Sequence, residues 1–115
     1  MSYDFGTNKE IYALHLDGVR IHAAAPFLEP GKDGVQIDML IQTDDSMYVV
    51  EIKRRRQIEA DIVDEVKAKV RAIRKPRGIS IRKGLIYEGE LAPSVKRCGY
   101  FDALVDIDHF VRNEF

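Results

Sequence analysis

Two apolar stretches of alternating pattern, at residues 35–42 and 47–53, most constrain what this chain can fold into. Successive side chains of a strand point to opposite faces, so each stretch predicts a strand with one continuous apolar face. Between them lies Thr43-Asp44-Asp45-Ser46, a cluster of residues that favour turns. If Asp44 and Asp45 form a two-residue loop, facing residues have numbers that add up to 89. The pattern therefore predicts an antiparallel hairpin, in which a slip of one residue would exchange the two faces.

The polar side chains of this hairpin fall on a single face. In the register above, Asp38 lies opposite Glu51, and Gln36 lies opposite Lys53. Two carboxylates that face one another repel unless they share a cation. Magnesium is held by one or two carboxylates together with waters and phosphate oxygens. The hairpin thus predicts a site for Mg²⁺ or Mn²⁺ that hydrolyses phosphodiesters, in which Lys53 neutralises the attacked phosphate or helps to deprotonate the attacking water.

An ordinary hairpin with charged residues on its solvent face is the alternative interpretation. Asp38, Glu51 and Lys53 taken alone would favour that alternative, because such residues are common on exposed strands. Both stretches are otherwise strongly apolar, and their polar residues are confined to facing positions. This confinement favours the functional interpretation.

Local signals in the rest of the chain predict a single α/β domain over residues 1–115. The expected elements are a helix at 7–16, a strand at 19–25 that ends at Pro26, a helix at 57–74, a strand at 79–87, a turn or short helix at 92–96, a strand at 101–107 and a short helix at 108–115. The strand after the long helix is expected to return parallel to the strand of Glu51 through a right-handed crossover. The prediction is a mixed central sheet flanked by helices, in the order α-β-β-β-α-β-β.

Composition excludes several classes of protein. Hydrophobic residues make up 45% of the chain and charged residues 32%, which is typical of a soluble globular protein, and no apolar run is long enough for a membrane span. Cys98 is the only cysteine, so an internal disulfide and a cysteine-based zinc cluster are excluded, and a cytoplasmic location is expected. The three histidines, His15, His22 and His109, have no spacing typical of a zinc site.

Positive charge is concentrated in one part of the chain, although the net charge is only -1. Residues 52–87 contain 12 lysines and arginines but only 4 acids. Arg54, Arg55 and Arg56 follow the predicted site directly. A basic patch beside a metal site suits a polyanionic substrate, so nucleic acid is the expected partner, with these three arginines as its ligands. The patch itself does not select DNA over RNA, and DNA is taken as the expected substrate. A solvated basic loop is the alternative.

Asp38, the hairpin and Glu51-Ile52-Lys53 together resemble the signature of the PD-(D/E)XK nucleases, whose core is the restriction-endonuclease-like fold. More narrowly, residues 34–43 and 48–53 are similar to the carboxy-terminal nuclease-like domain of prokaryotic ATP-binding proteins of the AAA type. In that group a Gly-x-Gln-Ile-Asp strand also precedes a Glu-Ile-Lys strand. The later segments 62–67 and 99–101 are similar to its helix and tail, so that the resemblance covers residues 8–111.

The resemblance implies a role for each residue of the motif. It makes Asp38 and Glu51 metal ligands, with the carbonyl of Ile52 as a further contact to the ion. It makes Lys53 the catalytic lysine and places Gln36 at the edge of the same site. The family often adds an acid from the first helix.

For that additional acid, Glu10 is the available residue and Asp4 a weaker one. If Asn8 and Lys9 are aligned with the first helix of the family, the expected glutamate falls before or near Ser2, where this chain has none. Glu10 is therefore interpreted as a surface residue of the helix. No Gly-x-x-x-x-Gly-Lys-Ser/Thr loop occurs, so the ATPase part is absent, and the chain is interpreted as an excised or free-standing domain whose candidate partner is an AAA-type ATPase. The rival function is a non-catalytic nucleic-acid-binding or assembly module, and homodimers through exposed edge strands are a further expectation.

Overall fold

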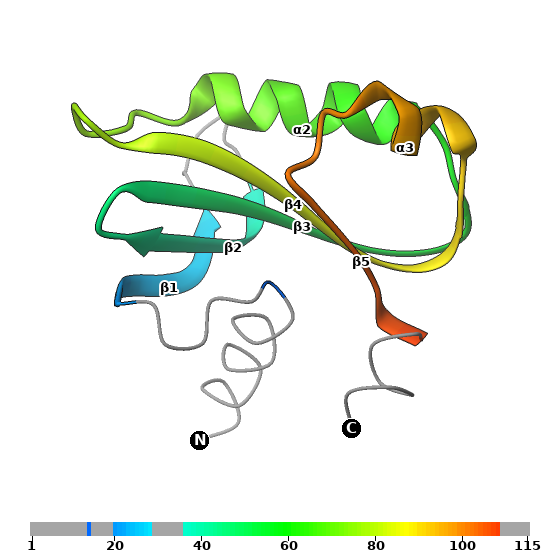
Figure 1. Ribbon diagram of the computed structural model, residues 1–115, viewed down its shortest axis with the longest axis horizontal. Coiled ribbons are helices and arrows are strands. Elements are labelled where there is room, and N and C mark those ends of the chain that lie inside the picture. Colours follow the sequence, from blue (N-terminus) through cyan, green and yellow to red (C-terminus); the bar gives the residue numbers. More distant parts are fainter. Residues whose placement is uncertain (1–13, 15–19, 29–35, 109–115) are drawn as a thin grey trace.

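The computed structural model of the protein describes Leu14, residues 20–28 and residues 36–108, and shows one five-stranded sheet with helices on it (Figure 1). The elements are β1 (Ile21–Leu28), β2 (Gln36–Thr43), β3 (Ser46–Ile58), α2 (Asp61–Ala72), β4 (Ser80–Leu91), α3 (Pro93–Cys98) and β5 (Ala103–Asp106). Except for Leu14 and Asp108, the helices expected at 7–16 and at 108–115 lie outside the described residues. Within the described part of the chain, no helix is long and apolar enough to cross a membrane.

The sheet is mixed, as predicted. Its strands lie in the order β1-β2-β3-β4-β5, with antiparallel pairing from β1 to β3 and parallel pairing from β3 to β5. The helix α2 connects β3 to β4, which confirms the predicted parallel return. In Figure 1, α2 and α3 lie on the same side of the sheet. The protein is therefore an α/β domain in which β3, the central strand, is covered by α2.

The hairpin of β2 and β3 has the predicted register. Met39 pairs with Val50, and Leu40 pairs with Val49, so that facing residue numbers add up to 89. The turn is closed by Ser46, whose backbone N–H donates to Oγ1 of Thr43 at 3.1 Å. Asp44 and Asp45 do not favour the left-handed backbone conformation that Asn-Gly adopts in two-residue turns. The hydrogen bond between Ser46 and Thr43 stabilises the turn instead.

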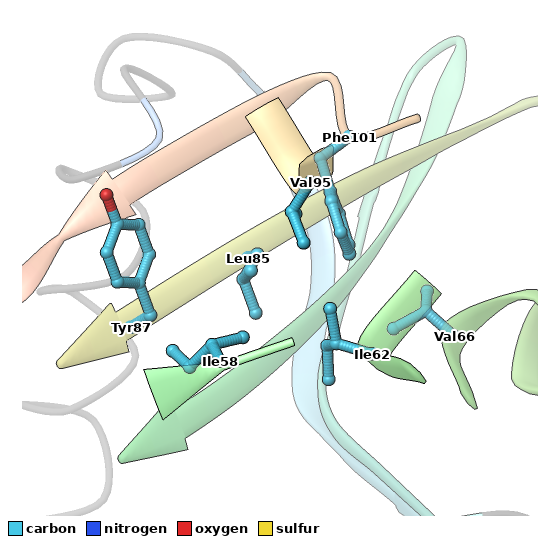
Figure 2. Packing of buried hydrophobic residues seen from close by; sticks show 7 residues of the cluster. All are labelled: Ile58, Ile62, Val66, Leu85, Tyr87, Val95 and Phe101. Atoms are coloured by element: carbon cyan, nitrogen blue, oxygen red, sulfur yellow. The ribbon is translucent and has the colours of Figure 1, made fainter. Parts of the chain in front are cut away.

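Buried residues form one cluster on each face of the sheet. The cluster under α2 and α3 consists of Ile58, Ile62, Val66, Leu85, Tyr87, Val95 and Phe101 (Figure 2). The cluster on the opposite face consists of Leu14, Met39, Ile41, Val50 and Ile86. Up to Arg54, before the irregularity in its pairing with β4, successive residues of β3 alternate between these faces. The even-numbered Val50 therefore packs on the opposite side from Glu51, which puts the polar row of the hairpin on the α2 side.

The strand β3 is longer than predicted, and the helix after it begins later. The prediction started the helix at residue 57, but β3 continues to Ile58 and α2 begins at Asp61. Ile58 and Ile62 are both fully buried in the cluster under α2. Their spacing of four residues is typical of a helix, although Ile58 belongs to the strand. Consequently Arg54, Arg55 and Arg56 lie within β3, and the alternative interpretation of a basic loop is wrong.

The first strand also differs from its prediction. It was expected to end at Pro26, yet β1 runs through Pro26 to Leu28. Its pairing with β2 is irregular between Ala25 and Phe27, on either side of the proline. Because β1 is an edge strand, the missing N–H of Pro26 interrupts pairing on one side only. Proline therefore marks an irregularity within this strand and not its end.

Candidate active site

The polar row of the hairpin and one side of α2 line a common pocket of about 310 Å³. Its lining residues are Gln36, Asp38, Glu51, Ile52, Lys53, Glu65 and Lys69. The first five are the site residues expected from the sequence. Glu65 and Lys69, which come from α2, were not expected. The structure thus places the predicted residues of two strands together and adds an acid and a base from the helix.

Asp38 links the two strands through its side chain. Met39 and Val50 form the last ladder pair on this side of the hairpin, so Asp38 and Glu51 are not the backbone partners that the register alone predicts. Instead Oδ2 of Asp38 accepts the backbone N–H of Ile52 at 2.8 Å. Among the described residues, no hydrogen bond to Oδ1 of Asp38 is found. One carboxylate oxygen therefore positions the side chain, and the other remains available to a ligand.

Glu51 is a carboxylate buried at the bottom of this arrangement. Its side chain is only 2% exposed, and both of its oxygens accept hydrogen bonds from Nζ of Lys69, at 2.8 and 3.0 Å. Burial raises the pKa of the Glu51 carboxyl above its ordinary value of 4.5, the Lys69 ammonium opposes this rise, and Asp38 adds to it. The surroundings hence resist the negative charge of Glu51 even with a cation beside it.

Lys53 is held by two carboxylates. Its Nζ lies 2.9 Å from Oε2 of Glu65 and 3.6 Å from Oε2 of Glu51. The hydrogen bond to Glu65 raises the pKa of Lys53, against a smaller opposing effect of burial. Lys53 is consequently a protonated ammonium at neutral pH. It is suited to stabilise negative charge on a phosphate and is not suited to accept a proton from water.

The charged groups of the pocket alternate in sign. Along the row Lys69, Glu51, Lys53 and Glu65, each ammonium lies within 3.6 Å of a carboxylate. Glu65 also lies 4.0 Å from the guanidinium of Arg55. These four charges cancel, and Asp38 adds one negative charge beside them. Burial and specific charged partners displace the pKa values of Glu51 and Lys53, and such displaced pKa values are typical of functional sites.

The three consecutive arginines lie along β3 beyond the pocket. Arg54 and Arg55 form long contacts with acids, at 3.7 Å to Glu88 and 3.6 Å to Asp61 respectively. Arg56 is exposed and has no ion pair among the described residues. The arginines also line a second hollow, of about 350 Å³. Their positive charge is therefore accessible from solvent next to the site.

The carboxylates of the pocket fit a hard divalent cation. Mg²⁺ takes oxygen ligands in small number, and Asp38 and Glu51 supply two carboxylates from neighbouring strands. Within residues 20–28 and 36–108, no group of three or more His, Cys, Asp or Glu side chains could hold a metal ion. Glu10 and Asp4, the acids considered from the first helix, lie outside the described residues. A two-carboxylate site is thus what the described part of the chain provides.

The other candidate residues lie away from this pocket. Cys98 is exposed and donates to the carbonyl of Val95. His22 pairs with Asp44 in the turn of the hairpin. In comparisons with known proteins, no family model, curated protein or solved structure matches the chain.

Neutralising Glu51 is expected to preserve or raise the stability of the metal-free protein. The pKa of Glu51 in the folded state lies above its ordinary value of 4.5, so folding favours the protonated carboxyl. This contribution is fully present below the unfolded-state pKa and is lost as the pH rises through the folded-state pKa. Glu51→Gln replaces the carboxyl group by an amide of the same shape, which is neutral at every pH. The variant should therefore melt at or above the wild-type temperature at neutral pH and lose this advantage in acid.

Thermal melts in the presence of a chelator, from acid pH through neutrality, check this expectation. Glu90→Gln, at an exposed position of β4, is the matched control and should show no such pH-dependent difference. If Glu51→Gln were destabilised by more than about 1 kcal/mol at neutral pH, the hydrogen bonds from Lys69 would outweigh the effect of burial.

Proposed function

We propose that this domain is a metal-dependent nuclease of the PD-(D/E)XK type, with a restriction-endonuclease-like fold. The observation that carries the proposal is the meeting of Asp38, Glu51 and Lys53 in one pocket, where Glu51 is a buried carboxylate. Burying a carboxylate is unfavourable, and an apolar residue at this position would stabilise the fold at least as well. A functional site that uses the negative charge of Glu51 would explain why a carboxylate is buried at this position.

Each residue of the pocket has a distinct role in this proposal. Asp38 and Glu51 would hold Mg²⁺ or Mn²⁺, with the carbonyl of Ile52 as a further ligand. The bound ion would supply an activated water and would neutralise charge on the phosphodiester. Lys53 stabilises the additional negative charge of the pentavalent phosphate. Gln36, which is exposed at the rim of the pocket, contacts the substrate beside the metal.

The arginines beyond the pocket support a polyanionic substrate. Arg54, Arg55 and Arg56 continue along the same strand as Lys53, so a nucleic acid backbone bound to them would pass the pocket. Contacts of this kind bind phosphates without reading sequence. We propose DNA as the substrate, in the cytoplasm, with an AAA-type ATPase as partner. A homodimer would form through β1 or β5, which are the edges of the sheet.

A catalytically inactive nucleic-acid-binding or assembly domain is the second candidate function. It is favoured by the ion pairs of the site, since Glu51 is bonded to Lys69 and Lys53 is bonded to Glu65. In an inactive domain these pairs would serve only to satisfy charges. The basic strand would then bind nucleic acid or an acidic protein without cleaving it.

Metal binding and cleavage are expected to disappear together when Asp38 is changed to Asn. The amide oxygen of Asn can still accept the N–H of Ile52, so the fold should be kept while the ligand charge is lost. Metal affinity is expected to fall about tenfold or more, as for other changes in metal sites. Calorimetric titration with Mg²⁺ and Mn²⁺ measures the affinity. Incubation with plasmid, linear and single-stranded DNA and with RNA measures cleavage.

Asp64→Asn, an exposed acid on α2, is the matched control and should behave as the wild type does. Equal metal affinity in the wild type and Asp38→Asn would contradict the nuclease proposal. Metal-independent binding of nucleic acid without cleavage would support the inactive binding module.

A further inference from the structure

The helix α2 brings two charged side chains to the candidate site. Ile62 and Val66 are fully buried in the cluster that also contains Ile58 (Figure 2), and they fix this helix against the sheet. Glu65 and Lys69 are four residues apart, so they lie on the same side of the helix. Both line the pocket that contains Glu51 and Lys53. The position of α2 therefore determines how the carboxylates of the site are neutralised.

Lys69 lies against Glu51 in the manner of a bound cation. Its ammonium contacts both carboxylate oxygens, at 2.8 and 3.0 Å, and its side chain is 18% exposed. In the described part of the chain, Glu51 is the only hydrogen-bonding or ion-pairing partner of Lys69. Mg²⁺ would need an oxygen of the same carboxylate at about 2.0–2.1 Å. Because the ammonium of Lys69 contacts both oxygens, Mg²⁺ at either of them would be repelled unless Lys69 moves away.

The pocket contains a second carboxylate that can accept Lys69 if it leaves Glu51. Glu65 precedes Lys69 by four residues, and a Glu followed by a Lys at this spacing is the favourable orientation of a helical ion pair. At present Glu65 is bonded to Lys53. A shift of Lys69 to Glu65 would therefore weaken the hold of Glu65 on Lys53. Lys53 would then be free to contact an anion in the pocket.

We propose that Lys69 is a resident counter-ion of Glu51, which a divalent metal must displace, and that its transfer to Glu65 releases Lys53 toward the substrate phosphate. The inference rests on the proposed function, in which Glu51 is a metal ligand. It adds two positioning residues, Glu65 and Lys69, to the site. It also links metal binding to the availability of the Lys53 ammonium for the phosphate, because in the metal-free site Lys53 is paired with Glu65 and Lys69 with Glu51.

The test is the affinity of the protein for Mg²⁺ and Mn²⁺, measured by calorimetric titration without nucleic acid. Lys69→Met removes the competing cation and is expected to bind metal about ten- to a hundredfold more tightly, which is the effect of a hydrogen bond between charged groups. Lys67→Met is the matched control, because Lys67 is an exposed lysine of the same helix that lies over the ring of Tyr100. It should bind metal as the wild type does, within about twofold.

A second variant tests the destination of Lys69. Glu65→Gln removes the carboxylate that is to receive the displaced ammonium, so its metal affinity should fall below that of the wild type. If Lys69→Met does not fold, Lys69→Gln replaces it, because a neutral amide can still donate to Glu51. Thermal melts with and without metal give an independent measure. The metal-dependent rise in melting temperature should be larger in Lys69→Met than in the wild type.

The outcomes separate this inference from the proposed function. If Asp38→Asn weakens metal binding but Lys69→Met leaves it unchanged or weakens it, the nuclease proposal stands and Lys69 is only a structural support of Glu51. If neither the wild type nor any variant binds a divalent metal, the proposed function fails and the inference fails with it. Tighter binding in Lys69→Met together with weaker binding in Glu65→Gln is the result that the inference requires.

Discussion

In the proposed nuclease, replacing Lys53 by Met is expected to reduce nucleic acid cleavage about 100- to 1000-fold, the effect of removing one group that stabilises a developing negative charge. Divalent-metal binding should not be weakened, because Lys53 contributes a cation to the pocket and no metal ligand. Its pKa is raised by the hydrogen bond to Glu65, so the ammonium is charged at neutral pH and acts through that charge. Single-turnover cleavage in Mg²⁺, compared with calorimetric metal titration, measures both quantities.

The control for this change is Lys96→Met, an exposed lysine on α3. It alters the net charge equally and should leave cleavage as it is in the wild type. Cleavage by Lys53→Met at the wild-type rate would remove Lys53 from the mechanism. A parallel loss of metal binding and cleavage would show that Lys53 mainly maintains the geometry of Glu51. Only a loss of cleavage with metal binding retained agrees with charge stabilisation by this lysine.

Local patterns predict the central hairpin because its register follows from few interactions. The alternation of residues 35–42 determines which face is buried, and the short turn at Asp44 and Asp45 determines which residues pair. The pairing of Met39 with Val50 confirms this register. The mixed sheet is predicted in the same way, because two parallel neighbouring strands need a long crossover connection and the helix between β3 and β4 provides one. These features depend on residues that are close in sequence.

The ends of elements are less predictable because they depend on contacts between distant residues. Nothing in the composition of Arg54, Arg55 and Arg56 indicates a strand, and β3 continues through them because β4 pairs with Arg54 and again with Gln57 and Ile58. The same pairing places Ile58 in the cluster with Ile62, at a spacing that is also typical of a helix. The helix was therefore started four residues too early. Tertiary pairing outweighs local propensity in this segment.

The candidate site was predictable only where it lies on the hairpin. Period-two alternation places Gln36, Asp38, Glu51 and Lys53 on one face, and the pocket contains all four. Glu65 and Lys69 lie in the segment 57–74, which the sequence predicts only as a helix. Their relation to β3 depends on how α2 crosses the sheet, which the sequence alone does not specify. A usable signal was their spacing of four residues beside the buried Val66, which places both close to the covered side of the helix.

A bulge between β3 and β4 positions the arginines beyond the pocket. Pairing passes from Arg54 with Glu88 directly to Gln57 with Glu90. Two residues of β3 are thus opposed by the single residue Gly89, which has a φ of +124°. An added Cβ at Gly89 would lie only 1.6 Å from the carbonyl oxygen of Arg55. The strand can therefore bend here only because this residue has no side chain.

Gly89→Ala is accordingly expected to destabilise the protein by more than about 4 kcal/mol, in the range reached only by changes that disrupt the backbone or the core. The clash is with backbone atoms of Arg55, so no rotation of a side chain can relieve it. Gly78→Ala is the matched control, because Gly78 also has a positive φ, of +85°, but nothing lies within 4 Å of its added Cβ. It should cost about 1–2 kcal/mol, the effect of the unfavourable φ alone.

Denaturant unfolding of the two variants separates the clash from the φ preference. A large difference between them shows that close contact at the bulge holds β3 against β4. Equal and small losses would mean that the backbone at Arg55 shifts easily, and the arginines would then have no fixed direction relative to the pocket. Because Arg55 also contacts Glu65 at 4.0 Å, a displaced bulge should alter the charge network of the site as well. The loss of stability in Gly89→Ala therefore tests whether the three arginines of β3 are held in a fixed position relative to the carboxylates of the pocket.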